Sequence, residues 1–430
     1  MTKITLIGAG SIIFAKNLIG DCLLTECLQD SEIALVDINK KHLQLSYEMI
    51  CNLNTVINQG RAKITAHIDR REALPGTDFV ITAIQIGGYE RIVSDFEIPL
   101  KYGLQQTYAD TLGIGGIFRG LRTTPVILDI ARDIEELCPN AWLLNYVNPM
   151  AIITGALLKV GNIHAVGLCH SVQICAETLL EELGLHYPDA KYKIAGVNHQ
   201  AWLLELTSGD KDLYPIVKAA ANAQENHPDR VRLEILKRFG YYVTESSIHT
   251  AEYTPYFIKK ANSGLAASFA IDPLMFRNWA NDQNKFWDET VLDMIKDKSL
   301  HHERTIEYSS HIMEAMLTNN PIEIGGNVLN QGFINNLPQG ACVEVPCTVG
   351  SRGLTPHFMG NLPPQCAGLN RTYLNPVELT IEALLSGKKE HVYHAALLDP
   401  HTAAELTTDE IIHMCDEMLE ANRGWIPDLK

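Results

Sequence analysis

Two short segments carry a thiol and imidazole rings directly after apolar stretches of the chain. Cys169, His170 and Ser171 follow one such stretch, and Asn198 and His199 come later. A thiolate and an imidazole from two strand ends could bind a divalent metal and leave coordination positions open for substrate oxygens. They could also form a Cys–His nucleophilic pair, or be a buried thiol and a hydrogen-bonded core imidazole. Because their spacing matches no standard zinc motif, the residues alone leave all three interpretations open.

Three other polar segments could bind a hydroxyl-rich ligand or move protons. Asn148 precedes a proline and therefore lies in an extended turn, where its amide could contact hydroxyl groups or cap a helix. Asp110 leads into a glycine-rich loop that permits close backbone approach to a ligand, and Arg119 and Arg122 follow on one helix face. These charges could equally be a helix cap and a solvated face. Residues 244–255 are dense in Glu, His and Tyr but flanked by apolar residues, which supports a proton-transfer site at least as well as an exposed loop.

A dinucleotide-binding turn stands near the start of the chain. The strand-like residues 3–7, with Ile4, Leu6 and Ile7, lead into Gly8 and Gly10, and a second apolar stretch ends at Asp37. The glycines let backbone N–H groups approach a pyrophosphate at a helix N-terminus, and the carboxylate can hold two ribose hydroxyls. Ile13 replaces the third glycine of the full pattern, so the prediction rests on the position of the turn between a strand and a helix; the alternative is a βαβ unit without a nucleotide. The carboxylate would repel a 2′-phosphate and no Lys or Arg directly follows it, which favours NAD over NADP.

The elements that must position these residues alternate between apolar stretches and helical patterns. The strands predicted in the first half of the chain span residues 3–7, 33–37, 78–84, 141–146 and 164–169, with an amphipathic helix at 125–137. In such an α/β arrangement, ligands bind at the carboxyl ends of parallel strands. We therefore expect a Rossmann-like dinucleotide-binding domain over residues 1–195.

The pattern changes to α+β after residue 195, and a chain of 430 residues is long enough for two domains. The second domain is predicted over residues 196–430. It should contain a strand at 202–207, helices at 231–239, 278–296 and 302–316, a β-rich stretch at 322–349 and closing helices. Residues 259–277, which are rich in Ala and Ser and include Gly264 and Pro273, should form a surface segment or lid.

Composition excludes several classes of partner. The net charge of −16 argues against nucleic acid and anionic membranes, because both repel an acidic surface. No apolar run approaches the roughly 18 residues that a membrane span needs, and the N-terminus lacks the pattern of a signal peptide. The ten cysteines have no disulfide-framework spacing, and Cys342 and Cys347 lack a second pair that would close a zinc ribbon. We expect a cytoplasmic protein that acts on a small molecule in a reducing compartment.

Taken together and in order, these motifs resemble the family 4 glycoside hydrolases, the NAD-dependent exception among glycosidases, and most closely their α-galactosidase (melibiase) branch. The resemblance covers essentially the whole chain and is carried by residues 7–11, 85–89, 109–113, 145–150, 167–172, 198–199, 242–247, 336–338, 393–396 and 399–402. It implies a Rossmann-like domain related to lactate and malate dehydrogenases, followed by an α+β domain. It also implies NAD and a divalent cation, usually Mn²⁺, as cofactors, and a homodimer or homotetramer.

The resemblance also implies roles for single residues. Cys169 and His199 become the metal ligands, and Tyr253 becomes the base that removes the C2 proton of the sugar. The general acid is either His170, which stands where some family members carry aspartate, or Asp110. The residues expected to contact NAD are Gly8, Gly10, Ser11, Ile12, Asp37 and Gln85. Those expected to contact the substrate are Asn148 and Arg119.

The implied reaction is hydrolysis without net redox change. NAD takes a hydride from C3, the metal stabilises the resulting ketone and enolate, and the C2 proton is removed. The C1 oxygen then leaves by elimination, water adds, and the hydride returns. An α-galacturonidase, which would need a cationic group for the C6 carboxylate, or an α-glucosidase of the same family is the alternative. Two other classes are a 2-hydroxy acid dehydrogenase, with Arg119 or Arg122 holding a carboxylate, and a non-catalytic NAD sensor.

Overall fold

The computed structural model describes residues 1–224, 227–297 and 299–430, with the backbone alone described for residues 280–289. Its strands are β1 (Lys3–Ile7), β2 (Glu32–Val36), β3 (Lys63–His67), β4 (Phe79–Thr82), β5 (Trp142–Asn145), β6 (His164–Gly167), β7 (Lys191–Val197), β8 (Gln200–Ser208), β9 (Lys211–Asp212), β10 (Tyr242–Val243), β11 (Ile322–Leu329), β12 (Cys342–Gly350) and β13 (Gly353–Pro356). Its helices are α1 (Ile12–Leu24), the short η1 (Glu26–Leu28), α2 (Lys40–Asn58), α3 (Arg70–Ala73), α4 (Gly88–Lys101), α5 (Gly113–Leu137), α6 (Met150–Val160), α7 (Ser171–Glu182), α8 (Tyr214–Ala223), α9 (Arg230–Phe239), α10 (Ser247–Tyr253), α11 (Leu265–Ser268), α12 (Met275–Lys296), α13 (Ser309–Thr318), α14 (Pro364–Ser386), α15 (Glu390–Leu398), α16 (Pro400–Glu405) and α17 (Thr408–Ala421).

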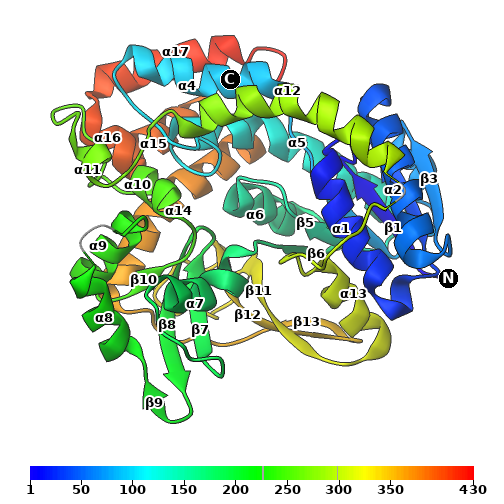
Figure 1. Cartoon of the computed structure of the whole chain (residues 1–430). Helices are drawn as coiled ribbons and strands as arrows, with labels where there is room; N and C mark the ends of the chain where they lie inside the picture. Colours follow the sequence, from blue (N-terminus) through cyan, green and yellow to red (C-terminus); the bar gives the residue numbers. More distant parts are fainter. Residues whose placement is uncertain (225–226, 298) are drawn as a thin grey trace.

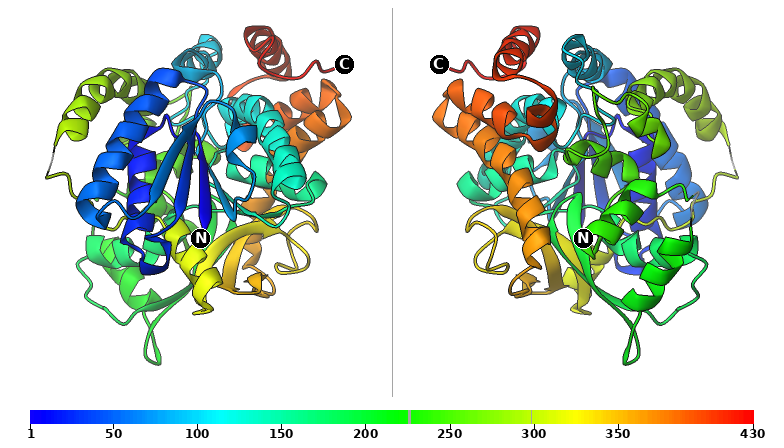
Figure 2. Two further views of the ribbon diagram at one scale, coloured as in Figure 1. Left: turned by 90° about the vertical axis from the view of Figure 1, so that its right-hand side faces the viewer. Right: turned by 90° about the vertical axis from the view of Figure 1, so that its left-hand side faces the viewer.

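One mixed sheet runs through the molecule in the order β10-β8-β7-β12-β11-β6-β5-β4-β1-β2-β3 (Figure 1). The part from β6 to β3 is parallel and has the strand order of a dinucleotide-binding Rossmann fold. Neighbouring residues of a strand enter opposite cores: Leu6 shares a core with Leu18 of α1, and Ile7 shares one with Ile127 of α5. The left view of Figure 2 shows the blue helices on one side of these strands and the cyan helices on the other.

The strands predicted in the first half are confirmed as β1, β2, β4, β5 and β6. β3 was not predicted, because this edge strand is polar and partly exposed and has no continuous apolar run. The helix expected at 125–137 is longer, since α5 begins at Gly113 and continues through Pro125. The glycines near its start allow close packing rather than ending a helix: a Cβ on Gly116 would lie 2.5 Å from the backbone of Thr111.

The second half continues the same sheet with antiparallel strands, which confirms an α/β Rossmann-like part followed by an α+β part. The β11–β12 hairpin is joined to β6 on one side and to β7 on the other, and each of these two junctions consists of a single residue pair. Asn327 of β11 pairs with Gly167 of β6, and Glu344 of β12 pairs with Gly196 of β7. The division between residues 195 and 196 stays a prediction, because residue 195 lies within β7.

The helices predicted at 231–239 and 278–296 are confirmed as α9 and α12, whereas the helix predicted from 302 was wrong at its start. α13 begins at Ser309. The residues before it are held to α1 by side chains instead: the His302 Nε2 atom lies 2.8 Å from Asp21 Oδ1, and the Thr305 backbone N–H donates to the same oxygen at 3.0 Å.

The segment expected to form a surface segment or lid contains α11 and the first residues of α12. α12 lies against α2 and α4, and Arg277 of α12 forms an ion pair with Glu97 of α4.

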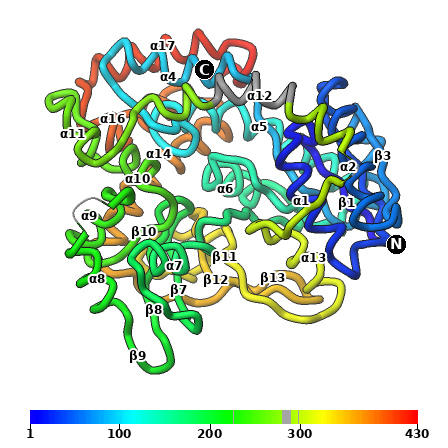
Figure 3. Tube along the Cα trace, in the orientation of Figure 1, coloured from blue at the N-terminus to red at the C-terminus, as the bar shows by residue number. Residues whose placement is uncertain are grey.

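The closing helices are confirmed as α14 to α17, with α17 beside α4 and α14 beside α5 (Figure 3). The ten cysteines are free thiols, most of them buried. Within the described ranges, no helix combines the length and the apolar character needed to cross a membrane.

Candidate active site

A cavity of about 1040 Å³ opens at the carboxyl edge of the parallel strands, beside β1 and β4. This is the point where the strand order reverses and where dinucleotides bind in such sheets. All residues predicted to contact NAD line this cavity: Gly8, Gly10, Ser11, Ile12, Asp37 and Gln85. The two predicted substrate contacts, Asn148 and Arg119, line it as well, with the Arg119 Nε–H donating to the Asn148 carbonyl oxygen at 3.2 Å.

The turn after β1 leaves no room for a side chain at Gly8 or Gly10. Gly8 has φ of +100°, and a Cβ there would lie 2.2 Å from the Ala83 carbonyl oxygen. The Gly10 backbone N–H donates to Asp37 Oδ2 at 2.7 Å, and a Cβ on Gly10 would lie 2.6 Å from that oxygen. The bare backbone at the start of α1 and a carboxylate at the end of β2 are the two features that a dinucleotide requires, so the cavity fits NAD.

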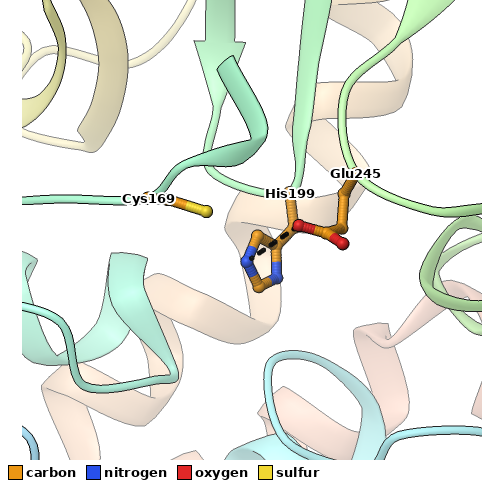
Figure 4. A group of neighbouring side chains, drawn as sticks. All are labelled: Cys169, His199 and Glu245. Atoms are coloured by element: carbon orange, nitrogen blue, oxygen red, sulfur yellow. Dashed lines mark ion pairs between the residues drawn. The ribbon is translucent and has the colours of Figure 1, made fainter. Parts of the chain in front are cut away.

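Three potential metal donors converge where strands from both halves of the sheet end (Figure 4). Cys169 follows β6, His199 lies in the turn between β7 and β8, and Glu245 follows β10. Their donor atoms all lie within 4.8 Å of one another, with 3.6 Å between His199 Nε2 and Glu245 Oε2. This spread is about twice a metal–ligand bond length, and a thiolate, an imidazole and a carboxylate suit a divalent transition metal. The donor set therefore fits the implied cation.

The electrostatics of the cluster suit a cation. Burial raises the pKa of the Cys169 thiol to about 12, and a nearby divalent cation would act in the opposite direction. Burial also opposes ionisation of Glu245, yet the nearby His249, His199 and His170 hold the pKa of its carboxyl at about 2. The Cys169 backbone is fixed by Tyr308, whose hydroxyl oxygen accepts the Cys169 N–H at 3.0 Å.

A chain of hydrogen bonds orients the His199 ring. The Thr111 hydroxyl donates to Asp110 Oδ1 at 2.7 Å and lies 3.1 Å from His199 Nδ1. Because the hydroxyl hydrogen is directed at the carboxylate, the hydroxyl oxygen accepts from His199 Nδ1–H. With Nδ1 as the donor, Nε2, which lies 3.6 Å from Glu245 Oε2, is the ring nitrogen that would bind a metal.

The loop that carries Asp110 and Thr111 is held by Glu252, a buried residue of α10. Its carboxylate accepts backbone N–H bonds from Thr107 at 2.7 Å, Tyr108 at 3.0 Å and Ala109 at 3.2 Å. Burial raises the pKa of Glu252 to about 7, although these backbone bonds act in the opposite direction. Glu252 was not singled out in the sequence, where its position in a dense polar segment was the one available signal.

The three predicted catalytic residues surround the cluster in different ways. The Tyr253 hydroxyl lies 3.3 Å from His199 Nδ1, and burial raises the pKa of this phenol well above its ordinary value. His170 Nδ1 lies 3.3 Å from Glu307 Oε1, and this contact raises the pKa of the imidazole to about 9 against the effect of burial. Asp110 Oδ1 accepts the hydrogen bond from the Thr111 hydroxyl at 2.7 Å.

Two further features of the site differ from what the residues suggested. Glu245 lies in the segment noted for proton transfer, but its approach to Cys169 and His199 was not foreseen. Arg122 does not accompany Arg119 at the cavity. It is buried, and its Nη1 donates to Asp95 Oδ1 at 2.9 Å and to Asn422 Oδ1 at 2.8 Å.

Comparison with known proteins identifies the family of this chain and agrees with the fold described above. The family model "Family 4 glycosyl hydrolase" matches residues 3–185, and the model of its C-terminal domain matches residues 194–402. The chain is 52% identical to an α-galactosidase from Bacillus subtilis (strain 168), over 100% of both chains, and 35% identical to an α-galactosidase from Rhizobium meliloti (strain 1021), over 99% of this chain and 89% of the relative. A crystal structure of a 6-phospho-α-glucosidase from gut microorganisms, in complex with NAD and Mn²⁺, has the same fold, with a TM-score of 0.84, 21% identity and 100% of both chains covered.

Proposed function

Because the chain belongs to the family 4 glycosyl hydrolases, we propose that it is an α-galactosidase that hydrolyses melibiose-like α-galactosides with NAD and Mn²⁺. One structural observation carries this proposal: the dinucleotide cavity and the Cys169–His199–Glu245 cluster lie at neighbouring strand ends. Asn148 of the cavity follows β5, and Cys169 follows β6. These parallel strands pair directly, with Asn145 opposite Gly167.

The cofactor cavity would hold NAD with Gly8, Gly10 and Asp37, and the cluster would hold Mn²⁺ with Cys169, His199 and Glu245. When bound, NAD would accept a hydride and return it, and the cation would polarise two neighbouring oxygens of the sugar. Asn148 is the proposed substrate contact, because it lines the cavity and follows β5, the strand that pairs with β6. The arrangement explains a redox cofactor in an enzyme whose net reaction is hydrolysis.

Tyr253 is the proposed base for the C2 proton, and His170 is the proposed acid for the leaving oxygen. The Tyr253 hydroxyl lies 3.3 Å from Nδ1 of His199, a member of the cluster, and this proximity supports Tyr253 as the base. His170 directly follows Cys169, and its pairing with Glu307 favours the protonated ring that an acid needs. Asp110, with Thr111, then serves to orient His199.

The surroundings of the cavity support a neutral galactoside over the alternatives. A 2-hydroxy acid dehydrogenase would need a free cation for a carboxylate, and an α-galacturonidase would need one for C6. Arg122, one of the two candidate cations, is taken up by the buried Asp95, with side chains 2% and 3% exposed, and does not line the cavity. We further propose that the protein is cytoplasmic, which the free thiols support, and that it binds neither nucleic acid nor membrane, which the net charge of −16 supports. A homodimer or homotetramer is proposed on the family resemblance alone.

A direct assay tests the proposed function. The protein is mixed with nitrophenyl α-galactoside, α-glucoside or α-galacturonide, each with and without NAD and Mn²⁺. We expect nitrophenol from the α-galactoside when both cofactors are present, without accumulation of NADH. A parallel reaction contains a 2-hydroxy acid in place of the glycoside, and stoichiometric NADH from it would instead identify a dehydrogenase. NAD binding that is insensitive to Mn²⁺, with no turnover of any glycoside, would identify a sensor.

A further inference from the structure

Three buried polar side chains lie beneath the metal cluster, where the two halves of the sheet join. A single row of residues crosses this junction: Gly167 of β6, Asn327 of β11, Glu344 of β12 and Gly196 of β7 pair in succession. Asn198 lies just beyond the end of β7. Figure 1 shows β11 and β12 lying between β6 and β7. Asn198, Asn327 and Glu344 are each at most 1% exposed.

The Glu344 carboxylate connects the other two side chains. Its Oε1 accepts from Asn198 Nδ2 at 3.4 Å and from Asn327 Nδ2 at 3.1 Å, and Asn327 Nδ2 also donates to the Gly167 carbonyl oxygen at 3.2 Å. Within the described part of the chain, Glu344 Oε2 and both amide oxygens have no hydrogen-bond partner. A buried carboxyl that is only half satisfied destabilises a fold compared with an apolar residue of similar size. Packing alone therefore gives no account of this side chain.

The distance between the proposed metal ligands Cys169 and His199 depends on the strands that this row of residues joins. Cys169 follows β6 and His199 follows β7, and these strands are not neighbours, because the β11–β12 hairpin lies between them. Each junction with the hairpin consists of one residue pair. His199 also has φ of +63°, a left-handed conformation that a side chain bearing a Cβ adopts reluctantly, so its turn needs an anchor.

We propose that Glu344 is a positioning residue of the metal centre, an inference that rests on the proposed function. Through Asn198 it anchors the turn that carries His199, and through Asn327 it connects this turn to the strand end that carries Cys169. One carboxylate thus sets the distance between two ligands that come from separate halves of the sheet. Loss of its hydrogen bonds should weaken metal binding while leaving the dinucleotide cavity intact.

The test measures Mn²⁺ dissociation from the full-length protein by electron paramagnetic resonance, with NAD affinity measured in parallel. Glu344→Ala should weaken Mn²⁺ binding roughly 10–100-fold, the usual effect of losing a group that orients a ligand. NAD affinity should be unchanged. Glu344→Gln should keep nearly wild-type Mn²⁺ affinity, because its amide oxygen can accept the same two bonds. Glu323→Ala, which removes an exposed carboxylate from the same hairpin, is the matched control and should have no effect.

The outcomes separate this inference from the proposed function. If the wild-type protein does not bind Mn²⁺, the metal centre is wrong and the role of Glu344 is wrong with it. If the wild-type protein binds Mn²⁺ and Glu344→Ala binds it equally well, the inference alone is overturned. Should Glu344→Ala fail to fold, Asn198→Ala removes the same link from the other side. The Asn198→Ala variant should then bind Mn²⁺ more weakly than the wild-type protein, and unchanged binding would overturn the inference.

Discussion

Replacing Cys169 with alanine is expected to lower kcat/KM for an α-galactoside by at least about a thousandfold, since loss of about 4 kcal/mol of charge stabilisation corresponds to that factor. The thiol is one of three potential donors within 4.8 Å of one another, and its loss leaves only an imidazole and a carboxylate. The backbone at this position should persist, because Tyr308 holds the amide at 3.0 Å. Steady-state kinetics with saturating NAD and a series of Mn²⁺ concentrations measures the effect.

Cys175→Ala is the control for the loss of a buried thiol. Cys175 lies on α7 and is 2% exposed, but it is not part of the cluster. This variant should keep its Mn²⁺ dependence and most of its activity. If Cys169→Ala retained full activity at the same Mn²⁺ concentration, Cys169 would not be a metal ligand, and the nucleophilic role would be excluded by the same result.

Replacing Tyr253 with phenylalanine is expected to lower kcat by about 10²–10⁴-fold, the usual contribution of a general base. The substitution removes one oxygen from a side chain that is 1% exposed, so the ring packing should be kept. The Mn²⁺ and NAD affinities should stay close to those of the wild-type protein, because neither donor set includes this hydroxyl. Stopped assays at saturating substrate, together with direct binding measurements, separate the two effects.

Tyr373→Phe provides the matched control for Tyr253. The two rings lie 5.7 Å apart, and the buried Tyr373 hydroxyl has no hydrogen-bond partner among the described residues. Removing this hydroxyl should leave kcat unchanged. If the Tyr253→Phe variant kept the wild-type kcat, Tyr253 would not be the base that removes the C2 proton.

The sequence predicts the Rossmann-like half well because its signals are local. The strands that lead to Gly8 and Asp37 are mostly apolar and are buried after their first residue, and the turn after β1 contains the glycines that the backbone needs. The errors have equally local causes. β3 lacks an apolar run, and the residues before Ser309 form side-chain bonds to Asp21 that no helical periodicity reveals.

The candidate site is less predictable, because it is assembled from segments that are distant in the sequence. From their spacing alone, Cys169 and His199 could be metal ligands, a nucleophilic pair or core residues. The family resemblance was needed to choose among these three interpretations. Nothing local indicates that Glu245 approaches both, or that Glu344 lies beneath them. These contacts arise because β11 and β12 insert between β6 and β7, a pairing that only the three-dimensional structure reveals.

The central claim is that NAD is used and regenerated within each turnover so that the C2 proton of the sugar can leave. Hydrolysis of melibiose in D₂O, with NAD and Mn²⁺ present, tests it most directly. The account predicts galactose that carries deuterium at C2, with no accumulation of NADH. Galactose without deuterium at C2, formed at the same rate and with the same requirement for NAD, would contradict it.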